Sequence, residues 1–192
     1  LHTEFSPLPG LTFRESLYNG VASDRINRQF RFCPRSDGMF NIGSLSYHIG
    51  EEDRHHGYYA VGYALGSSPS ETSADKTFNY ALWTLIEQPL LHVGESHLGA
   101  MWQGGTSPAS RSTCRHYWGA GLIWSNIPPQ MTQVGLVVNR ALYADGRETD
   151  VELTGSFPVC NHFTLQPAVH CINTNGNYTA AAQLRAILEF GN

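Results

Sequence analysis

Apolar and polar residues alternate along most of this chain with a period of two. The most regular segment is Tyr178–Phe190, where Tyr, Ala, Leu and Phe occupy the even positions, and Arg185 and Glu189 are among the odd ones. Successive side chains of a β-strand point to opposite faces, so the pattern predicts a strand with one apolar and one polar face. Ala, Leu, Arg and Glu also favour helices, but a helical stripe would mix Arg185 and Glu189 with Leu184 and Leu188.

Similar segments recur upstream. Between residues 116 and 124, Trp118 and Trp124 share an apolar face with Ala and Leu, while Gly119 and Gly121 lie on the reverse. The pattern predicts about ten strands. In chain order they are Leu11–Tyr18, Met39–Ile49, Tyr58–Leu65, Phe78–Glu87, His97–Gly104, His116–Trp124, Gln133–Tyr143, Thr149–Phe157, His162–Ile172 and Tyr178–Phe190.

Two kinds of connection join these strands, and they largely alternate. The long polar ones are Asn19–Asp37, Gly66–Lys76 and Thr106–Thr113, and the short ones include Glu51–His56, Ala144–Gly146 and Pro158–Asn161. Short turns at one rim and long loops at the other are typical of an up-and-down β-barrel. No linker or boundary interrupts the series. We therefore predict an all-β fold, an antiparallel up-and-down β-barrel, with residues 1–192 forming one barrel domain or a barrel segment.

Alternation alone does not tell whether the apolar face points inward, as in a soluble barrel, or outward to lipid. Charged and amide groups lie in the middle of strands on the polar faces, which a solvated lumen tolerates. Aromatic residues lie near strand ends, as in the girdles of membrane barrels; these are Trp118, Trp124, Phe157, Phe163, Tyr178 and Phe190. Both features favour a transmembrane barrel. A soluble up-and-down barrel that binds a small apolar ligand is the alternative.

Composition excludes several classes of protein. Charged residues make up only 15% of the chain, against about 25% in an ordinary soluble domain, which argues against coiled coils and charged helical bundles. The net charge of −4 and the lack of a basic run argue against a nucleic-acid partner. No apolar run reaches the roughly 18 residues of a transmembrane helix. Spacing does not determine the pairing of the four cysteines, Cys33, Cys114, Cys160 and Cys171.

The segments Tyr117–Trp124, Val134–Asn139 and Glu148–Leu153 resemble strands of the carbohydrate-selective porins of Gram-negative outer membranes, the OprB type. Phe163–His170 is close to the penultimate-strand signature of that family. Leu17–Gly20 and Gly57–Gly62 are similar to earlier strands. Family members are roughly twice as long, with about sixteen strands. The chain therefore either closes a small barrel alone or corresponds to the C-terminal part of a larger one.

The resemblance implies a porin that passes small sugars by passive diffusion across the outer membrane, without catalytic residues, cofactors or metals. Its other partners would be outer-membrane lipid and the barrel-assembly machinery, which would recognise the terminal strand ending in Phe190. Polar faces of the last three strands would then line the lumen and hydrogen-bond sugar hydroxyls, with an aromatic platform. The candidates are Arg185, Gln183, Glu189, Gln166, His170 and Glu152, with Asp150 beside them, and Trp83 or Tyr117 as the platform. Generic solvation of the lumen is the alternative role for each.

Two motifs suggest other chemistry. Ser96 and His97 suggest a membrane-barrel hydrolase, but adjacent Ser and His rarely aim at one another, and no acid partner is indicated. His48, His55 and His56 surround one short connection and could bind zinc. A wet rim with local charge pairs is the simpler interpretation of these histidines.

Overall fold

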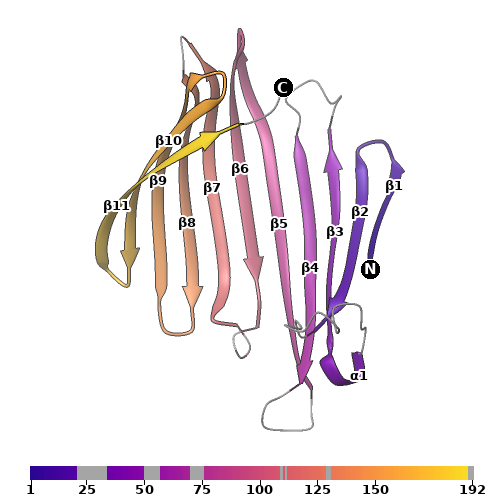
Figure 1. The fold of residues 1–192 in the computed structure, drawn as a ribbon. Helices are drawn as coiled ribbons and strands as arrows, with labels where there is room; N and C mark the ends of the chain where they lie inside the picture. The colour runs from indigo at the N-terminus through magenta and orange to yellow at the C-terminus, as the bar shows by residue number, and fades with distance from the viewer. Residues whose placement is uncertain are drawn as a thin grey trace.

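A computed structural model describes residues 1–20, 34–49, 57–69, 76–108, 110, 112–128 and 131–189. These residues form eleven strands in one sheet, each antiparallel to its neighbours in the chain (Figure 1). The strands are β1 (His2–Leu8), β2 (Leu11–Asn19), β3 (Met39–His48), β4 (Tyr58–Pro69), β5 (Lys76–Val93), β6 (Ser96–Thr106), β7 (Cys114–Ile127), β8 (Met131–Tyr143), β9 (Arg147–Cys160), β10 (Phe163–Thr174) and β11 (Asn177–Leu188), and one short helix, α1 (Pro34–Asp37), precedes β3. Among the described residues, no helix has the length and apolar character needed to span a membrane.

The predicted all-β, up-and-down architecture is confirmed, and all ten predicted strands are present. Strand β1 was not predicted, because His2–Leu8 mixes polar residues with Pro7 and shows no clean alternation. Its strand conformation comes from pairing with β2, in which Phe5 lies opposite Phe13. Strand β5 is longer than predicted, because it continues through a β-bulge between Pro89 and Leu91.

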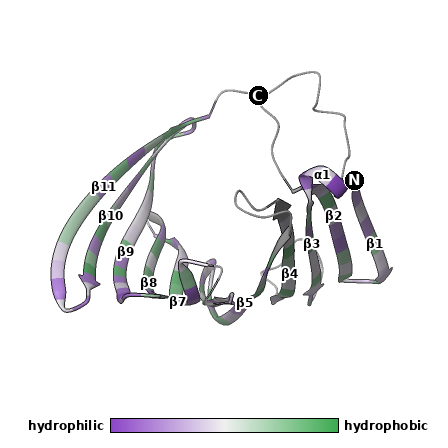
Figure 2. Cartoon of the chain, turned by 90° about the horizontal axis from the view of Figure 1, so that it is seen from below, coloured by the Kyte–Doolittle hydropathy of each residue, from purple (hydrophilic) through white to green (hydrophobic). Residues whose placement is uncertain are grey.

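The sheet curves strongly, so that it has a concave and a convex face (Figure 2). Residues directly opposite one another in an antiparallel pair point to the same face, so the register assigns every strand residue to one of them. Leu122 on β7 pairs with Leu136 on β8, which pairs with Leu153 on β9. The residues between them, such as Val137 and Glu152, form the other set. The two alternating sets that the sequence predicts in β7 to β11 therefore lie on opposite faces, and the concave set combines the polar residues with a few apolar ones such as Val137.

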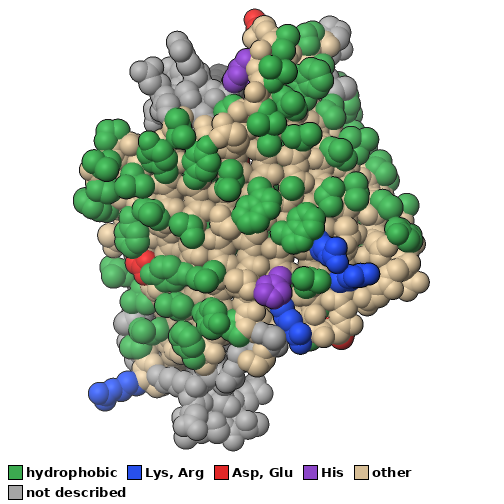
Figure 3. Space-filling model, turned by 180° about the vertical axis from the view of Figure 1, so that it is seen from behind, with side chains coloured by type: hydrophobic (Ala, Val, Ile, Leu, Met, Phe, Trp, Pro, Cys, Tyr) green, Lys and Arg blue, Asp and Glu red, His purple; other side chains and the backbone are tan. Residues whose placement is uncertain are grey.

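The apolar set covers the convex face, as the view from behind shows (Figure 3). Leu136, Leu153 and Leu184 of this set are 48%, 55% and 67% exposed. Among the described residues only two apolar side chains, Ala60 and Ala168, are buried, and both belong to the concave set. A soluble domain of this length would bury a substantial apolar core. This sheet instead turns its apolar side chains outward.

Every second connection of a meander lies at the same rim. The three long connections therefore share one rim; they join β2 to β3, β4 to β5, and β6 to β7. The short turn Ala144–Gly146 was expected at the opposite rim, but it joins β8 to β9 at this long-loop rim. Its neighbour there is the hairpin turn of Asn175 and Gly176, whose φ values of 54° and 95° explain the Asn-Gly sequence. Asn175 Oδ1 accepts a 2.8 Å hydrogen bond from the Arg147 N–H.

One carboxylate interrupts the apolar convex face. Glu15 on β2 lies directly opposite Gly43 on β3, and Gly43 lies opposite Tyr63 on β4. The Tyr63 hydroxyl donates to Glu15 Oε2 over 2.9 Å, and Asn41 Nδ2 donates to Oε1. The missing side chain at Gly43 leaves the room for this carboxylate and ring. These two hydrogen bonds therefore stabilise the negative charge of Glu15 within its apolar surroundings.

Candidate functional site

A chain of hydrogen bonds crosses the concave face from β6 to β8. Gln103 Nε2 on β6 donates to the hydroxyl of Tyr117 on β7 over 2.6 Å. That hydroxyl donates to Asn139 Oδ1 on β8 over 2.7 Å. The three side chains come from three neighbouring strands, so the sheet register itself fixes their order and spacing.

Gly119 makes this arrangement possible. It lies on β7 directly between Gln103 on β6 and Asn139 on β8. A Cβ atom at Gly119 would lie 3.1 Å from Gln103 Nε2 and from the Tyr117 hydroxyl, and still closer to Asn139 Oδ1. Any larger residue would therefore displace the three polar side chains, which explains a glycine in the middle of this strand.

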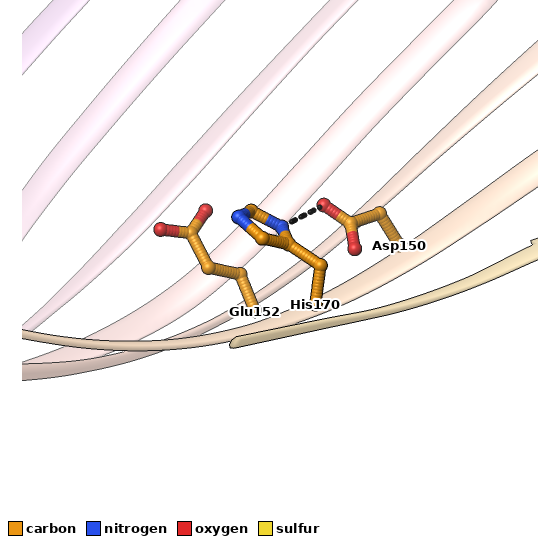
Figure 4. Close-up of side chains that lie close together, drawn as sticks. All are labelled: Asp150, Glu152 and His170. Carbon is orange, nitrogen blue, oxygen red and sulfur yellow. Dashed lines mark hydrogen bonds and ion pairs between the residues drawn. The ribbon is translucent and has the colours of Figure 1, made fainter. Parts of the chain in front are cut away.

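The polar surface continues onto β9 and β10. Asp150 lies directly opposite Asn139. His170 Nδ1 lies 3.1 Å from Asp150 Oδ2, and the side chains of His170 and Asp150 are both about one-fifth exposed (Figure 4). Glu152 lies directly opposite His170 and flanks the imidazole on the side away from Asp150 (Figure 4). We call these six residues the polar belt: Gln103, Tyr117, Asn139, Asp150, Glu152 and His170.

The β9–β10 end of the belt is also a set of potential metal ligands. One ligand atom each from Asp150, Glu152 and His170 lies within 4.8 Å of the others. Asp150 Oδ1 is buried without a hydrogen-bond partner in the described structure. Carboxylate and imidazole groups suit a divalent cation such as Zn²⁺. The same groups are also hydrogen-bonding groups for a polar solute.

A shallow hollow of about 190 Å³ adjoins the belt on β8 to β10. Gln166 on β10 lines it, and its Nε2 lies 3.5 Å from Ser156 Oγ on β9. Gln133, Gly135 and Thr154 complete the polar side of the hollow. Ile123 and Val137 also line the hollow, so the concave surface beside the belt combines amide, hydroxyl and glycine residues with apolar side chains.

The structure divides the predicted sugar-contact residues into three groups. Tyr117, His170 and Glu152 lie together in the belt, and Gln166 lies beside it. Trp83 on β5 shares the concave face and a cross-strand row with Gly105 and Tyr117, so it lies about 10 Å from Tyr117. The Trp83 ring covers Gly62 on β4.

The third group belongs to the end of the chain. Arg185 and Gln183 on β11 share the concave face with Gln166 and Ala168 on β10, their cross-strand partners. Both are exposed, as is Glu189 just after β11, and in the described part of the chain none of the three makes a side-chain hydrogen bond or ion pair with the belt. The polar side chains that contact one another on the concave face therefore come from β6 to β10, and the predicted role of Arg185, Gln183 and Glu189 in sugar contact stays a prediction.

Sequence reasoning missed Gln103 and Asn139 as members of the site. Each is a polar residue on the same face of its strand as glycines or small residues, which is the signal that could have indicated them. Their partner Tyr117 was considered only as an aromatic platform. Its contribution in the structure is instead its hydroxyl, which both accepts and donates.

The structure describes the Ser96–His97 motif in full and the motif of His48, His55 and His56 in part. The Ser96 hydroxyl donates to the backbone carbonyl of Asn126 over 2.7 Å, and His97, the next strand residue, points to the opposite face. This pair therefore has no nucleophile-base geometry. His55 and His56 lie outside the described residues, and His48 contacts the ring of Tyr58 at 4.6 Å between centroids. Cys114, Cys160 and Cys171 are free thiols, and Cys33 lies outside the described residues.

No protein-family model and no curated protein sequence matches this chain. A solved structure does: OprB of Pseudomonas putida, at high pH, superposes with a TM-score of 0.74 over 97% of this chain, at 12% sequence identity. The chain has an OprB-type porin fold. It spans 56% of the length of the OprB chain, so its eleven strands correspond to part of that barrel. The OprB-type fold predicted from the sequence segments is confirmed.

Proposed function

We propose that this chain forms part of the wall of an outer-membrane porin that passes small neutral sugars by diffusion. The observation that carries the proposal is the distribution of side chains on the curved sheet. Large apolar residues cover the convex face, whereas the polar belt lies on the concave face. In an OprB-type barrel the convex face would contact lipid and the concave face would line the channel.

The chemistry of the belt supports a sugar as the solute. Asn139 Nδ2, His170 Nε2 and the Glu152 carboxylate have no hydrogen-bond partner among the described residues, so both donors and acceptors remain for a ligand. Sugar hydroxyls need both kinds of group. Each such hydrogen bond contributes only about 0.5–1.5 kcal/mol net, which suits passage rather than tight binding.

The same distribution argues against a soluble barrel that holds an apolar ligand. Such a barrel buries apolar side chains on its concave face. In the described structure that face carries the belt, glycines and small residues beside a few apolar side chains such as Ile123 and Val137, whereas most of the exposed large apolar residues lie on the convex face. The catalytic alternative has no support from Ser96 and His97, and the porin proposal requires no reaction.

Closure of the channel needs further strand pairing. Strands β1 and β11 each have a single neighbour in the described sheet. Backbone groups at an open edge cannot be satisfied in lipid. We propose that additional strands of a longer protein complete the wall in a Gram-negative outer membrane. The assembly machinery would recognise the terminal strand, whose Phe190 lies outside the described residues.

Liposome swelling with the natural protein that contains this sequence tests the function directly. We expect glucose to enter faster than a monovalent ion pair with a similar hydrated radius, because Arg185 and the nearby acidic residues supply both signs of charge on the concave face. Swelling in glucose should vanish in liposomes prepared without the protein. Faster entry of either ion than of glucose would contradict the proposed selectivity.

A further inference from the structure

The convex face carries a second polar feature, which a channel on the other face does not use. Arg140 on β8 and Arg147 on β9 belong to the convex set, as does His116 on β7. The view from behind shows basic and histidine side chains gathered at one place on an otherwise largely apolar surface (Figure 3). We call His116, Arg140 and Arg147 the basic cluster.

The sheet register places these three side chains around one leucine. Leu142 on β8 lies directly opposite His116 on one side and Arg147 on the other. Arg140 precedes Leu142 by two residues on the same face and lies opposite Trp118. Diagonal neighbours on one face of a sheet are about 7–8 Å apart, so two guanidinium groups and an imidazole can reach a single ligand.

The positive charges lack a counter-charge in the described structure. The ion pairs of the described residues join Arg14 to Glu4 and His170 to Asp150, and neither involves the cluster. Next to His116, the Nε atom of Arg115 is buried without a hydrogen-bond partner. Charge on an apolar surface is costly unless it is paired, so an anion on the cluster would stabilise this surface.

The position of the cluster indicates the source of that anion. Arg147 directly follows the β8–β9 turn, so the cluster lies at the long-loop rim. Trp118, next to Arg140, has the amphipathic side chain that favours a membrane interface. Arginine forks match the oxygens of a phosphate in bidentate geometry.

We propose that the basic cluster binds the phosphate of an anionic lipid headgroup at the long-loop rim. Arg140 and Arg147 hold the phosphate, His116 donates a further hydrogen bond, and Trp118 and Leu142 contact the apolar part of the lipid below it. This inference rests on the proposed function, because it requires the convex face to lie in a membrane.

Brominated lipids quench tryptophan on contact, and two tryptophans of β7 provide a matched pair. Trp118 and Trp124 both lie on the convex face, toward opposite rims. One variant of the natural protein would keep Trp118 as its single tryptophan, and a second would keep Trp124. Each would be placed in phosphatidylcholine vesicles that contain either brominated phosphatidylglycerol or brominated phosphatidylcholine. We expect phosphatidylglycerol to quench Trp118 preferentially, and both lipids to quench Trp124 equally. Each of Arg140→Gln and Arg147→Gln should reduce the preference about five-fold, since one basic residue contributes roughly 1 kcal/mol at an anionic lipid surface.

The outcomes separate the lipid site from the membrane placement. If neither lipid quenches Trp124, the convex face does not contact lipid and the proposed function itself is wrong. If Trp124 is quenched but Trp118 shows no preference for phosphatidylglycerol, only the lipid site is overturned. The same conclusion follows if the double variant Arg140→Gln/Arg147→Gln keeps the preference of Trp118 while quenching of Trp124 is unchanged. If inorganic phosphate abolishes the preference as effectively as added phosphatidylglycerol does, the cluster is a site for free phosphate and the lipid assignment is wrong.

Discussion

Replacing Leu136 with arginine should prevent stable insertion of the protein, whereas arginine at the next residue should be tolerated. Leu136 lies on the convex face, 48% exposed, in the middle of β8. An arginine facing lipid near the bilayer midplane costs about 2–4 kcal/mol in a membrane barrel, and a few kcal/mol is a large part of the stability of a protein. Reversible urea unfolding in lipid vesicles would measure the loss.

Val137→Arg is the matched control, because the same side chain is introduced one residue along the same strand. Val137 points to the concave face directly opposite Glu152, so a new arginine there would meet water and a carboxylate. We expect its free energy of unfolding to change by roughly 1 kcal/mol or less. If the control were as damaging as Leu136→Arg, or if Leu136→Arg were harmless, the assignment of the two faces would be wrong.

Removing polar groups from the belt should slow sugars selectively. Asn139→Leu removes the acceptor of the Tyr117 hydroxyl and an amide that faces the channel. His170→Leu removes the partner of Asp150. Each lost hydrogen bond to a sugar corresponds to about a two- to ten-fold change in affinity. We expect glucose flux in liposome swelling to fall by a factor in this range, while flux of the smaller polyol glycerol stays nearly constant.

Three further variants locate the effect within the channel. Thr179→Val removes a hydroxyl from the concave face of β11, away from the belt, and should leave the ratio of glucose to glycerol flux unchanged. Arg185→Ala and Gln183→Ala should have smaller effects than the belt variants, because both side chains lie on the exposed last strand. A proportional fall of both solutes in the belt variants would mean that these residues set only the width of the channel.

Periodicity was sufficient to predict most of the fold. In β7 to β11 the alternating residues lie on the faces that the sequence indicated. Successive side chains of a strand point to opposite faces, so the pairing register fixes the face of every residue. Strand β1 was missed, since a short strand such as His2–Leu8 depends on its neighbour rather than on its own pattern. The position of the Ala144–Gly146 turn was also misjudged, because length alone does not assign a turn to a rim.

The candidate site was predicted less completely than the fold. His170, Glu152 and Tyr117 were identified as polar or aromatic residues on lumen-facing positions, but their grouping depends on the register between strands far apart in sequence. Gln103 and Asn139 are brought to the two sides of Gly119 by pairings that no local pattern reveals. The gap left by Gly119, which admits their hydrogen bonds to Tyr117, is visible only in three dimensions.

The channel, the belt and the lipid site all depend on which face of the sheet contacts lipid. Spin labels at Leu184 and Arg185 on β11, and at Val151 and Glu152 on β9, would test this most directly in the reconstituted natural protein. Labels at 184 and 151 should collide mainly with dissolved oxygen, which partitions into lipid, and labels at 185 and 152 with a water-soluble nickel complex. Equal access of both reagents to the two members of each pair, or a reversed pattern, would contradict the account.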